Sequence, residues 1–335
     1  MKAFLIIYNH SHAPRAESKK ISISPLCGIW QVYYTILMAI PQFPDFTPMS
    51  IELKSDMHPK ISLTVDGVSE FTFAGLYLFR NRYRYRISRL EDKTFIISGV
   101  QPQHNTGEEE KKFFMIPCAC PGRGVLEELL KTHDYWKNIP ESILIPEKER
   151  LHEWGIEVTE DRDNFDYLYL RSDLAELPGK KFHKKRNLIA QFLRSYEHEE
   201  KPLTQELIPQ ALKILDIWRR EKGDDGDYAA CKEALEHFDL LNLKGQITYI
   251  AGDPAGWCLG EPIARGRIFT IHFEKGLEQY KGIYQFINQA FAASLPEYFT
   301  HINREQDLGD EGLRQAKMTY RPSGFVRKYT GRLVQ

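Results

Sequence analysis

The stretch of residues 303–322, NREQDLGDEGLRQAKMTYRP, holds a density of acidic, basic and phenolic side chains that is rare in a merely structural segment. Glu305 and Asp307 precede a glycine turn, and Arg314, Lys317 and Tyr320 follow it. General acid–base and electrostatic catalysis both rely on side chains of these types. A carboxylate can take a proton or bind an ammonium group, a tyrosine can donate a proton, and cations can hold phosphate or offset developing charge.

The residues after this turn are expected to form a helix of about ten residues. Asp310 would cap its N-terminus, and Pro322 would stop it. One charged stripe would run along the helix, made of Asp310, Arg314, Lys317 and Arg321. We expect Leu313, Ala316 and Tyr320 to form the opposite, buried side. The alternating run 298–303 upstream predicts a strand, and a strand end that meets a helix start is where α/β proteins place their sites.

Each candidate also has a structural interpretation. Glu305 and Asp307 would serve fold stability alone if they formed an internal set of salt bridges with Arg314 and Lys317. This alternative and the catalytic one remain open at the level of sequence.

Three segments together resemble one known family. They are DRDNFDYLYLRSDLAELPGKKFHKKRNLIAQF, HFEKGLEQYKGIYQFINQAFA and INREQDLGDEGLRQAKMTYRP, within a match that runs from about Met49 to Arg327. The family is that of domains similar to the C-terminal catalytic domain of phosphatidylglycerol lysyltransferase. The resemblance implies a tandem pair of GNAT-like (acyl-CoA N-acyltransferase) folds, each a mostly antiparallel mixed sheet flanked by helices. In the enzyme that gives the family its name, such a pair moves an aminoacyl group from charged tRNA to a lipid headgroup.

The expected organisation has three parts. Residues 1–48 would be a poorly defined extension, with the natural start at Met49, or else an added helix that packs on the first domain. Residues 49–172 would form the first GNAT-like domain, and residues 173–335 the second, which carries the candidate site. We expect the first domain to be structural, because its turns carry no comparable cluster of charges.

The first domain is expected to begin with a helix at 71–80 and a meander of strands at 83–88, 94–100 and 113–117. A helix from Val125 to near Pro140 and strands at 142–145 and 166–170 would complete it. In the second domain we expect helices at 204–222 and 228–238, strands at 246–252, 256–262 and 267–274, and a helix at 282–295. This is the element order of the acyl-CoA N-acyltransferase fold.

A basic segment lies near the start of the second domain. Residues 179–196 hold six Lys or Arg and no acid, around a helix N-terminus where an anion would offset the unfavourable helix dipole. A solvated lysine face is the plain alternative. The resemblance favours contact of Lys184, Lys185, Arg186 and Asn187 with a phosphate of tRNA, a lipid headgroup or a nucleotide cofactor.

The turn before the last long helix would hold cofactor pyrophosphate in the resembling fold, through a Q/R-x-x-G-x-G/A pattern. Here Gln279 and Gly282 are in place, but Tyr284 stands where the last small residue belongs. Its side chain would crowd the close approach that glycine permits. Lys281 and Gly282 remain candidate anion contacts, and acetyl-CoA becomes a less favoured donor.

Composition excludes several classes of function. The 45 basic and 46 acidic residues leave no global field that points to nucleic acid or membrane. Five cysteines without CxxC spacing predict reduced thiols, neither a disulfide framework nor a metal site, in a cytoplasmic protein. No apolar stretch is long enough to span a bilayer comfortably.

Three functions therefore stay open. The first, which we favour, is an enzyme that transfers an aminoacyl or acyl group, with charged tRNA as donor and a lipid headgroup, small molecule or peptide as acceptor. The second is a CoA-dependent N-acyltransferase with an acyl-CoA donor and a small molecule or peptide as acceptor. The third is a non-catalytic anion-binding protein built on a duplicated transferase fold.

Overall fold

The computed structural model describes residues 40–334 except 93, 103–108 and 224. The predictions for residues 1–39 therefore fall outside the described residues. Within the predicted extension, Thr47 and Pro48 form β1 (Thr47–Pro48), which pairs with β2 of the first sheet. Two residues before the expected start at Met49 thus already belong to the fold.

The first sheet has seven strands in the order β1-β2-β3-β4-β5-β14-β6. After β1 these strands are β2 (Arg86–Arg89), β3 (Phe95–Val100), β4 (Lys112–Met115), β5 (Tyr135–Pro140), β6 (Ile156–Glu160) and β14 (Lys328–Leu333). One face packs on α2 (Lys54–Ile61), α3 (Phe73–Leu78) and α4 (Arg80–Tyr83), and the other on α5 (Arg123–Thr132) and α6 (Glu141–Glu153). Neighbours in β4 divide between these faces, since Phe113 joins the first core and Phe114 the other.

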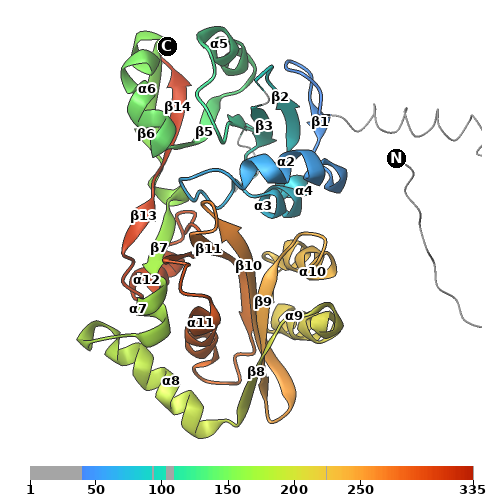
Figure 1. Ribbon diagram of the computed structural model, residues 1–335, viewed down its shortest axis with the longest axis vertical. Coiled ribbons are helices and arrows are strands. Elements are labelled where there is room, and N and C mark those ends of the chain that lie inside the picture. The colour runs from blue at the N-terminus through green and yellow to red at the C-terminus, as the bar shows by residue number, and fades with distance from the viewer. Residues whose placement is uncertain (1–39, 93, 103–108, 224, 335) are drawn as a thin grey trace, which may run out of the picture. The chain divides into compact units, whose positions relative to one another are not determined.

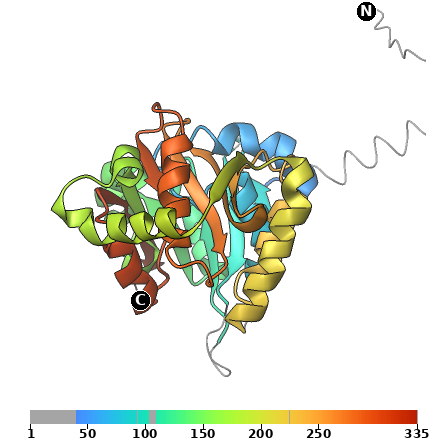
Figure 2. The same ribbon diagram turned by 90° about the horizontal axis from the view of Figure 1, so that it is seen from below.

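The second sheet also has seven strands, in the order β13-β7-β12-β11-β10-β9-β8. They are β7 (Asp166–Leu170), β8 (His198–Pro202), β9 (Lys244–Ile250), β10 (Asp253–Ile263), β11 (Ile268–Gly276), β12 (His301–Asn303) and β13 (Gly324–Val326). Figures 1 and 2 show α9 (Ile208–Lys222) and α10 (Tyr228–Glu236) on one face, and α8 (His183–Ser195) and α11 (Ile283–Ser294) on the other. The short α7 (Arg171–Glu176) packs beside α11. The second domain therefore has the elements that its sequence predicts.

The two halves repeat one topology. Each sheet is mostly antiparallel, and in each a single pair of strands is parallel with a helix between its members. These units are β4-α5-β5 in the first half and β11-α11-β12 in the second. The repeat confirms the predicted tandem pair of GNAT-like folds.

The halves exchange strands at their boundary. β7, which was expected to complete the first domain, lies in the second sheet between β13 and β12. The C-terminal strand β14 returns to the first sheet between β5 and β6. The predicted division at residues 172 and 173 therefore does not separate the two sheets. The reason is pairing across long sequence distances, which local patterns do not encode.

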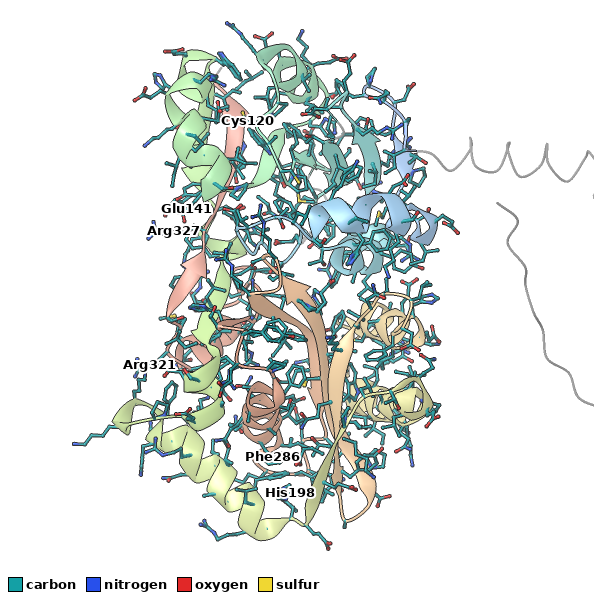
Figure 3. The ribbon with its side chains drawn as sticks, in the orientation of Figure 1. Cys120, Glu141, His198, Phe286, Arg321 and Arg327 are labelled. Atoms are coloured by element: carbon teal, nitrogen blue, oxygen red, sulfur yellow. The ribbon has the colours of Figure 1, made fainter. Side chains whose placement is uncertain are left out.

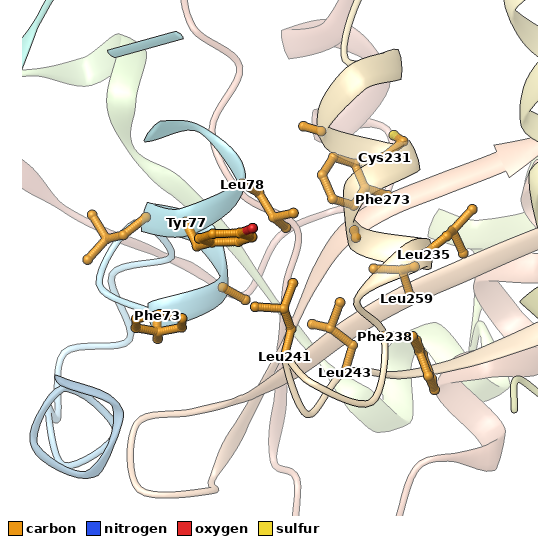
Figure 4. Packing of buried hydrophobic residues seen from close by; sticks show 14 of the residues in the cluster. Phe73, Tyr77, Leu78, Cys231, Leu235, Phe238, Leu241, Leu243, Leu259 and Phe273 are labelled. Atoms are coloured by element: carbon orange, nitrogen blue, oxygen red, sulfur yellow. The ribbon is translucent and has the colours of Figure 1, made fainter. Parts of the chain in front are cut away.

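A common hydrophobic core joins the halves. Phe73, Tyr77 and Leu78 of α3 share one buried cluster with residues of the second half, among them Leu235 and Phe273 (Figure 4). Burial of apolar surface at this junction contributes about 25 cal/mol per Å² to folding. The space between the sheets is therefore bordered by packed apolar side chains.

Two local predictions for the first half are wrong. Residues 142–145 were expected to form a strand, but they lie in α6, which continues through Pro146. The helix expected to reach Pro140 ends at Thr132, and Tyr135–Pro140 form a fully buried strand. A short apolar run fits a helix or a buried strand equally well, so packing decides between them.

The predicted helix after the glycine turn is α12 (Glu311–Met318). Asp310 caps it through a hydrogen bond from the Leu313 N–H. The prediction that Leu313 and Ala316 are buried is wrong. Leu313 is 44% exposed, and Ala316 is exposed as well. Arg314 and Lys317 instead turn toward the protein, where they find hydrogen-bond acceptors. Only Tyr320 is buried as expected.

Candidate functional site

A cavity of about 530 Å³ lies between the two halves. Its wall combines residues of the α3–α4 region and β5 in the first half with residues of β11, α11, the 304–308 loop and α12 in the second. Four predicted site residues line it on the second half, namely Lys185, Glu305, Lys317 and Tyr320. A cavity with such convergent polar groups is the usual form of a small-molecule site.

Glu305 is held firmly at the cavity wall. Its backbone has φ 56°, a left-handed conformation that costs free energy for a residue with a side chain. The N–H donates to Asn303 Oδ1 at 2.7 Å, and the carbonyl accepts from the Tyr167 N–H at 3.2 Å and from Lys317 Nζ at 3.3 Å. These bonds fix the direction in which the carboxylate points.

His272 of β11 supports that carboxylate from behind. Its Nδ1 lies 2.8 Å from Glu305 Oε1, and its Nε2 lies 3.0 Å from Glu261 Oε1. Burial opposes a charge on this ring, but the hydrogen bonds to Glu261 and Glu305 outweigh it and raise the pKa of His272 to about 10. The ring is therefore an imidazolium near neutral pH, and it engages one of the two oxygens of Glu305.

Lys317 reaches the cavity from α12. Its Nζ donates to the backbone carbonyls of Arg304 and Glu305. Burial and the nearby Arg304 lower the pKa of Lys317 to about 8. An ammonium with that pKa is a competent proton donor near neutral pH, because its pKa lies close to the pH of the reaction.

Tyr320 and Arg304 complete this wall. Burial raises the pKa of Tyr320 to about 12, although Arg304 opposes the shift. The Arg304 guanidinium lies 5.2 Å from the Tyr320 ring centroid and 3.3 Å from a carboxylate oxygen of Glu274. Lys185 Nζ lies 3.9 Å from the same ring, so a neutral phenol lies close to two cations.

Asp307 lies outside the cavity. Its fully buried carboxylate accepts hydrogen bonds from Arg314 at 2.8 and 3.0 Å and from the Tyr167 hydroxyl at 2.6 Å, and Arg162 lies 3.3 Å away. Burial would raise the pKa of Asp307, but the hydrogen bonds from Arg314, Tyr167 and the Gly309 N–H lower it to about 2. The geometry favours the salt-bridge interpretation for Asp307 and Arg314, and the catalytic and phosphate-binding roles expected for them have no support here.

We expect Asp307→Asn to lower the free energy of unfolding by about 1.5–3 kcal/mol at pH 7, since it weakens hydrogen bonds to a charged group. The pKa of Asp307 in the folded protein lies below its ordinary value of 3.8. This contribution is therefore complete above about pH 5 and is lost as the pH falls toward 2. Urea unfolding of both proteins across this pH range measures it.

Asp163→Asn is the matched control, because Asp163 pairs with the same Arg314 at 2.7 Å but its side chain is 59% exposed. It should change stability by less than about 1 kcal/mol. Equal losses in the two variants, or a loss in Asp307→Asn that persists at pH 2, would contradict the structural role.

The residues of the basic segment in α8 lie in different environments. Lys185 lines the cavity, whereas Lys184 and Asn187 are exposed outside its lining. Arg186 donates to the backbone carbonyls of Leu177 and Gly179, so it fastens the loop before the helix. Of the four predicted phosphate contacts, Lys185 alone joins the cavity wall.

The turn before α11 is also outside the cavity lining. Gly282 has φ 92°, and a Cβ built there would lie 2.8 Å from the Leu188 carbonyl oxygen, so packing on α8 explains the glycine. The Lys281 N–H lies 3.3 Å from the Tyr196 hydroxyl. Arg321, with φ 55°, is exposed at the surface (Figure 3). These three predicted anion contacts are therefore not brought together with Glu305.

Among the residues that the sequence did not single out, Glu70, Lys137, His272, Glu274 and Arg304 also line the cavity. His272 and Glu274 carried a weak signal, since they are polar residues that alternate with the apolar Ile271 and Phe273 in this strand. Glu70 and Lys137 carried none, because they belong to the half without a visible charge cluster.

Within the part of the chain that the structure describes, no cluster of three or more His, Cys, Asp or Glu side chains is arranged to hold a metal ion. No helix there is long and apolar enough to cross a membrane.

Comparison with known proteins identifies relatives of this arrangement. The family model described as "Phosphatidylglycerol lysyltransferase, C-terminal" matches residues 62–331. A conserved protein of unknown function from Bacteroides thetaiotaomicron has 28% identity and a TM-score of 0.74, over 86% of this chain and 99% of that one.

Two more distant structures share the fold. The C-terminal domain of a putative lysylphosphatidylglycerol synthetase from Agrobacterium fabrum has 11% identity and a TM-score of 0.56, over 84% of this chain and 92% of that chain. L-PGS from Bacillus licheniformis has 15% identity and a TM-score of 0.54, over 89% and 95% respectively. An uncharacterised protein from Mycoplasmoides gallisepticum is 24% identical over 179 residues. That match spans 50% of this chain and about half (56%) of the relative's length.

Proposed function

The chain belongs to the phosphatidylglycerol lysyltransferase C-terminal family, and from this premise we propose that it transfers an aminoacyl group from charged tRNA to a hydroxyl or amine acceptor. The observation that carries the proposal is the meeting of Glu305, Lys317 and Tyr320 in one cavity. A carboxylate fixed by strained backbone and a lysine with a pKa of about 8 are the acid–base pair that such a transfer needs.

In the proposed reaction, the acceptor's oxygen or nitrogen attacks the carbonyl carbon of the aminoacyl ester. Glu305 takes the proton that the nucleophile loses. The tetrahedral intermediate collapses when the carbon–oxygen bond to the tRNA ribose breaks, and Lys317 gives its proton to the leaving oxygen. Proton return from Glu305 to Lys317, directly or through water, restores the site, so the net products are an acylated acceptor and a free ribose hydroxyl.

The remaining groups of this wall stabilise charge. Arg304 and Lys185 flank the Tyr320 ring at 5.2 and 3.9 Å. Their cationic groups suit a phosphate of the donor and the oxyanion of the intermediate. Tyr320 remains protonated with a pKa of about 12, so it serves as a hydrogen-bond donor to the same oxygens.

Transfer from acyl-CoA has less support. The turn at Gly282 packs its backbone against Leu188, and Tyr284 donates a hydrogen bond to the Gly276 carbonyl at 3.0 Å beside it. Backbone N–H groups in this turn would have to hold pyrophosphate in a CoA-dependent enzyme. The crowding at both residues opposes that use.

The proposal predicts that charged tRNA raises the thermal stability of the purified protein more than uncharged tRNA does. A ligand present at a hundred times its dissociation constant adds about 2.7 kcal/mol to the folded state, which a melting experiment resolves. CoA and acetyl-CoA serve as parallel samples, each in low and high salt. Stabilisation by the CoA compounds alone would identify acyl-CoA, not aminoacyl-tRNA, as the donor. Equal stabilisation by charged and uncharged tRNA would show that the protein does not recognise the aminoacyl group.

A further inference from the structure

The charges that line the cavity do not balance. Its four carboxylates each hold a cation: Glu70 holds Lys328, Asp227 holds Lys275, Glu274 holds Arg304 and Glu305 holds His272. Four further cations of the lining have no carboxylate within 4.0 Å among the described residues, namely Arg82, Lys137, Lys185 and Lys317. The cavity therefore carries an excess of positive charge that an anionic ligand would offset.

These four cations lie on opposite sides of the cavity. Lys185 and Lys317 belong to the wall that holds Glu305, and the proposed reaction already uses them. Arg82, in α4, and Lys137, in β5, come from the first half. That half was expected to be structural, so its two cations need a separate explanation.

Lys137 is buried, and it has no counter-ion among the residues that the structure describes. It is only 6% exposed, and its Nζ has one hydrogen-bond partner, the neutral Gln101 Oε1 at 3.0 Å. The rings of Phe113 and Tyr83 lie 5.0 and 5.6 Å from the same nitrogen. An ammonium has three N–H groups, so donors remain for a ligand.

Nearby carboxylates do not compensate this charge. Burial lowers the pKa of Lys137, and Glu70 and Asp161 oppose the shift, but Glu70 already pairs with Lys328 and neither carboxylate forms an ion pair with Lys137. A buried cation without a partner is costly, and proteins keep such groups mainly where they bind something. Arg82 stands at the same side of the cavity, is exposed, and has no ion pair among the residues described.

We infer that Arg82 and Lys137 form an anion subsite in the first half, which binds a phosphate or carboxylate group of the acceptor. This inference rests on the proposed function, because it assigns the subsite to the second substrate of the transfer. Lys137 supplies a compact charge beside two aromatic faces, and the planar guanidinium of Arg82 is suited to two oxygens at once.

The acceptor is the substrate that fits this position. Both substrates must reach the carbon next to Glu305 and Lys317 from different directions. The donor's phosphate has Lys185 and Arg304 on the second half, beside the reacting groups. The cations of the first half then remain for the molecule that attacks.

The test is equilibrium binding by calorimetry of four probes to the full chain, namely inorganic phosphate, sn-glycerol 3-phosphate, succinate and dihexanoyl phosphatidylglycerol. The variants are Arg82→Gln and Lys137→Met, with Lys148→Gln as the control, an exposed lysine of α6 in the same half. We expect at least one probe to bind the wild type and to lose about tenfold or more in affinity in each of the two variants, because each removes a charged hydrogen-bond donor. Lys148→Gln should retain the wild-type affinity. The probe that binds most tightly shows whether the subsite prefers a free phosphate, a phosphodiester headgroup or a carboxylate.

Failure of the inference and failure of the proposed function give different results. If no probe binds the wild type, or if the probes bind both variants as tightly as the wild type, the subsite is wrong, whatever charged tRNA does. If charged tRNA fails to stabilise the wild type while the probes still depend on Arg82 and Lys137, the anion subsite stands and aminoacyl transfer is wrong. Arg82 is exposed, so Arg82→Gln keeps the test decisive even if Lys137→Met fails to fold.

Discussion

Glu305→Gln should slow aminoacyl transfer by about 10²- to 10⁴-fold in a single-turnover assay with the donor that stabilises the protein. Glutamine has the same shape, and its carbonyl can still accept the hydrogen bond from His272 Nδ1, which is 2.8 Å from the native carboxylate. The variant loses only the ability to take a proton from the nucleophile. Donor affinity, measured by thermal shift, should therefore change far less than the transfer rate.

Glu311→Gln is the control, because Glu311 is an exposed residue of α12 near the same site and does not line the cavity. It should transfer at the wild-type rate. The opposite result for Glu305→Gln would assign Glu305 another role. A large loss of donor affinity with an unchanged rate constant would make Glu305 a binding group for the ammonium of the aminoacyl donor. Normal rate and normal affinity together would exclude Glu305 from the site.

Lys328→Met should lower the free energy of unfolding by about 3–5 kcal/mol at pH 7, measured by urea unfolding. Lys328 is fully buried, and its Nζ binds the carboxylates of Glu70 and Asp166, the latter at 2.7 Å. Asp166 also accepts from the N–H and hydroxyl of Ser69 and from Asn303 Nδ2. Without the lysine, the buried Asp166 carboxylate and the part-buried Glu70 carboxylate lose the cation that they share.

The pH dependence of this loss follows from the same contacts. Burial already raises the pKa of Asp166 to about 6, although Lys328 opposes the shift. Removing Lys328 would raise that pKa further, so protonation relieves the buried charge and the loss should shrink as the pH falls from 7 to 5. A constant loss over this range would contradict the electrostatic explanation.

Two further variants test the interpretation of that measurement. Arg327→Met removes the neighbouring cation, whose side chain is 52% exposed and lies 3.6 Å from Glu160, and should cost less than about 1 kcal/mol (Figure 3). Adding Asp166→Asn to Lys328→Met should restore part of the stability, since it removes one of the stranded charges. No recovery in the double variant would show that lost packing, not charge, dominates.

This buried network also joins the two halves. Glu70 belongs to the first half, Asp166 and Asn303 to the second sheet, and Lys328 to the strand that returns to the first sheet. Glu70 lines the cavity as well. The network that holds the two halves together therefore includes a residue of the cavity wall, Glu70, and so helps to fix the position of that wall.

Part of the candidate site could be predicted from residue types in one segment. Glu305, Lys317 and Tyr320 lie within sixteen residues of one another, and all three line the cavity. Asp307 and Arg314 come from the same segment but turn away from it, toward Arg162 and Asp163. Sequence spacing gives the face of a helix, and it does not say which face the rest of the protein covers.

The sequence by itself determined many of the local elements, including the Asp310 cap of α12 and, in the second half, the strands β9, β10 and β11 and the helices α9, α10 and α11. These depend on interactions between residues a few positions apart, which periodicity and capping residues report directly. Only the tertiary structure decided that β7 and β14 exchange between the sheets. The same holds for the contacts of His272 with both Glu261 and Glu305, and for the position of Lys137 in the cavity lining. The physical reason is that these contacts join residues from tens to hundreds of positions apart, and their energies depend on burial and distance that no local pattern encodes.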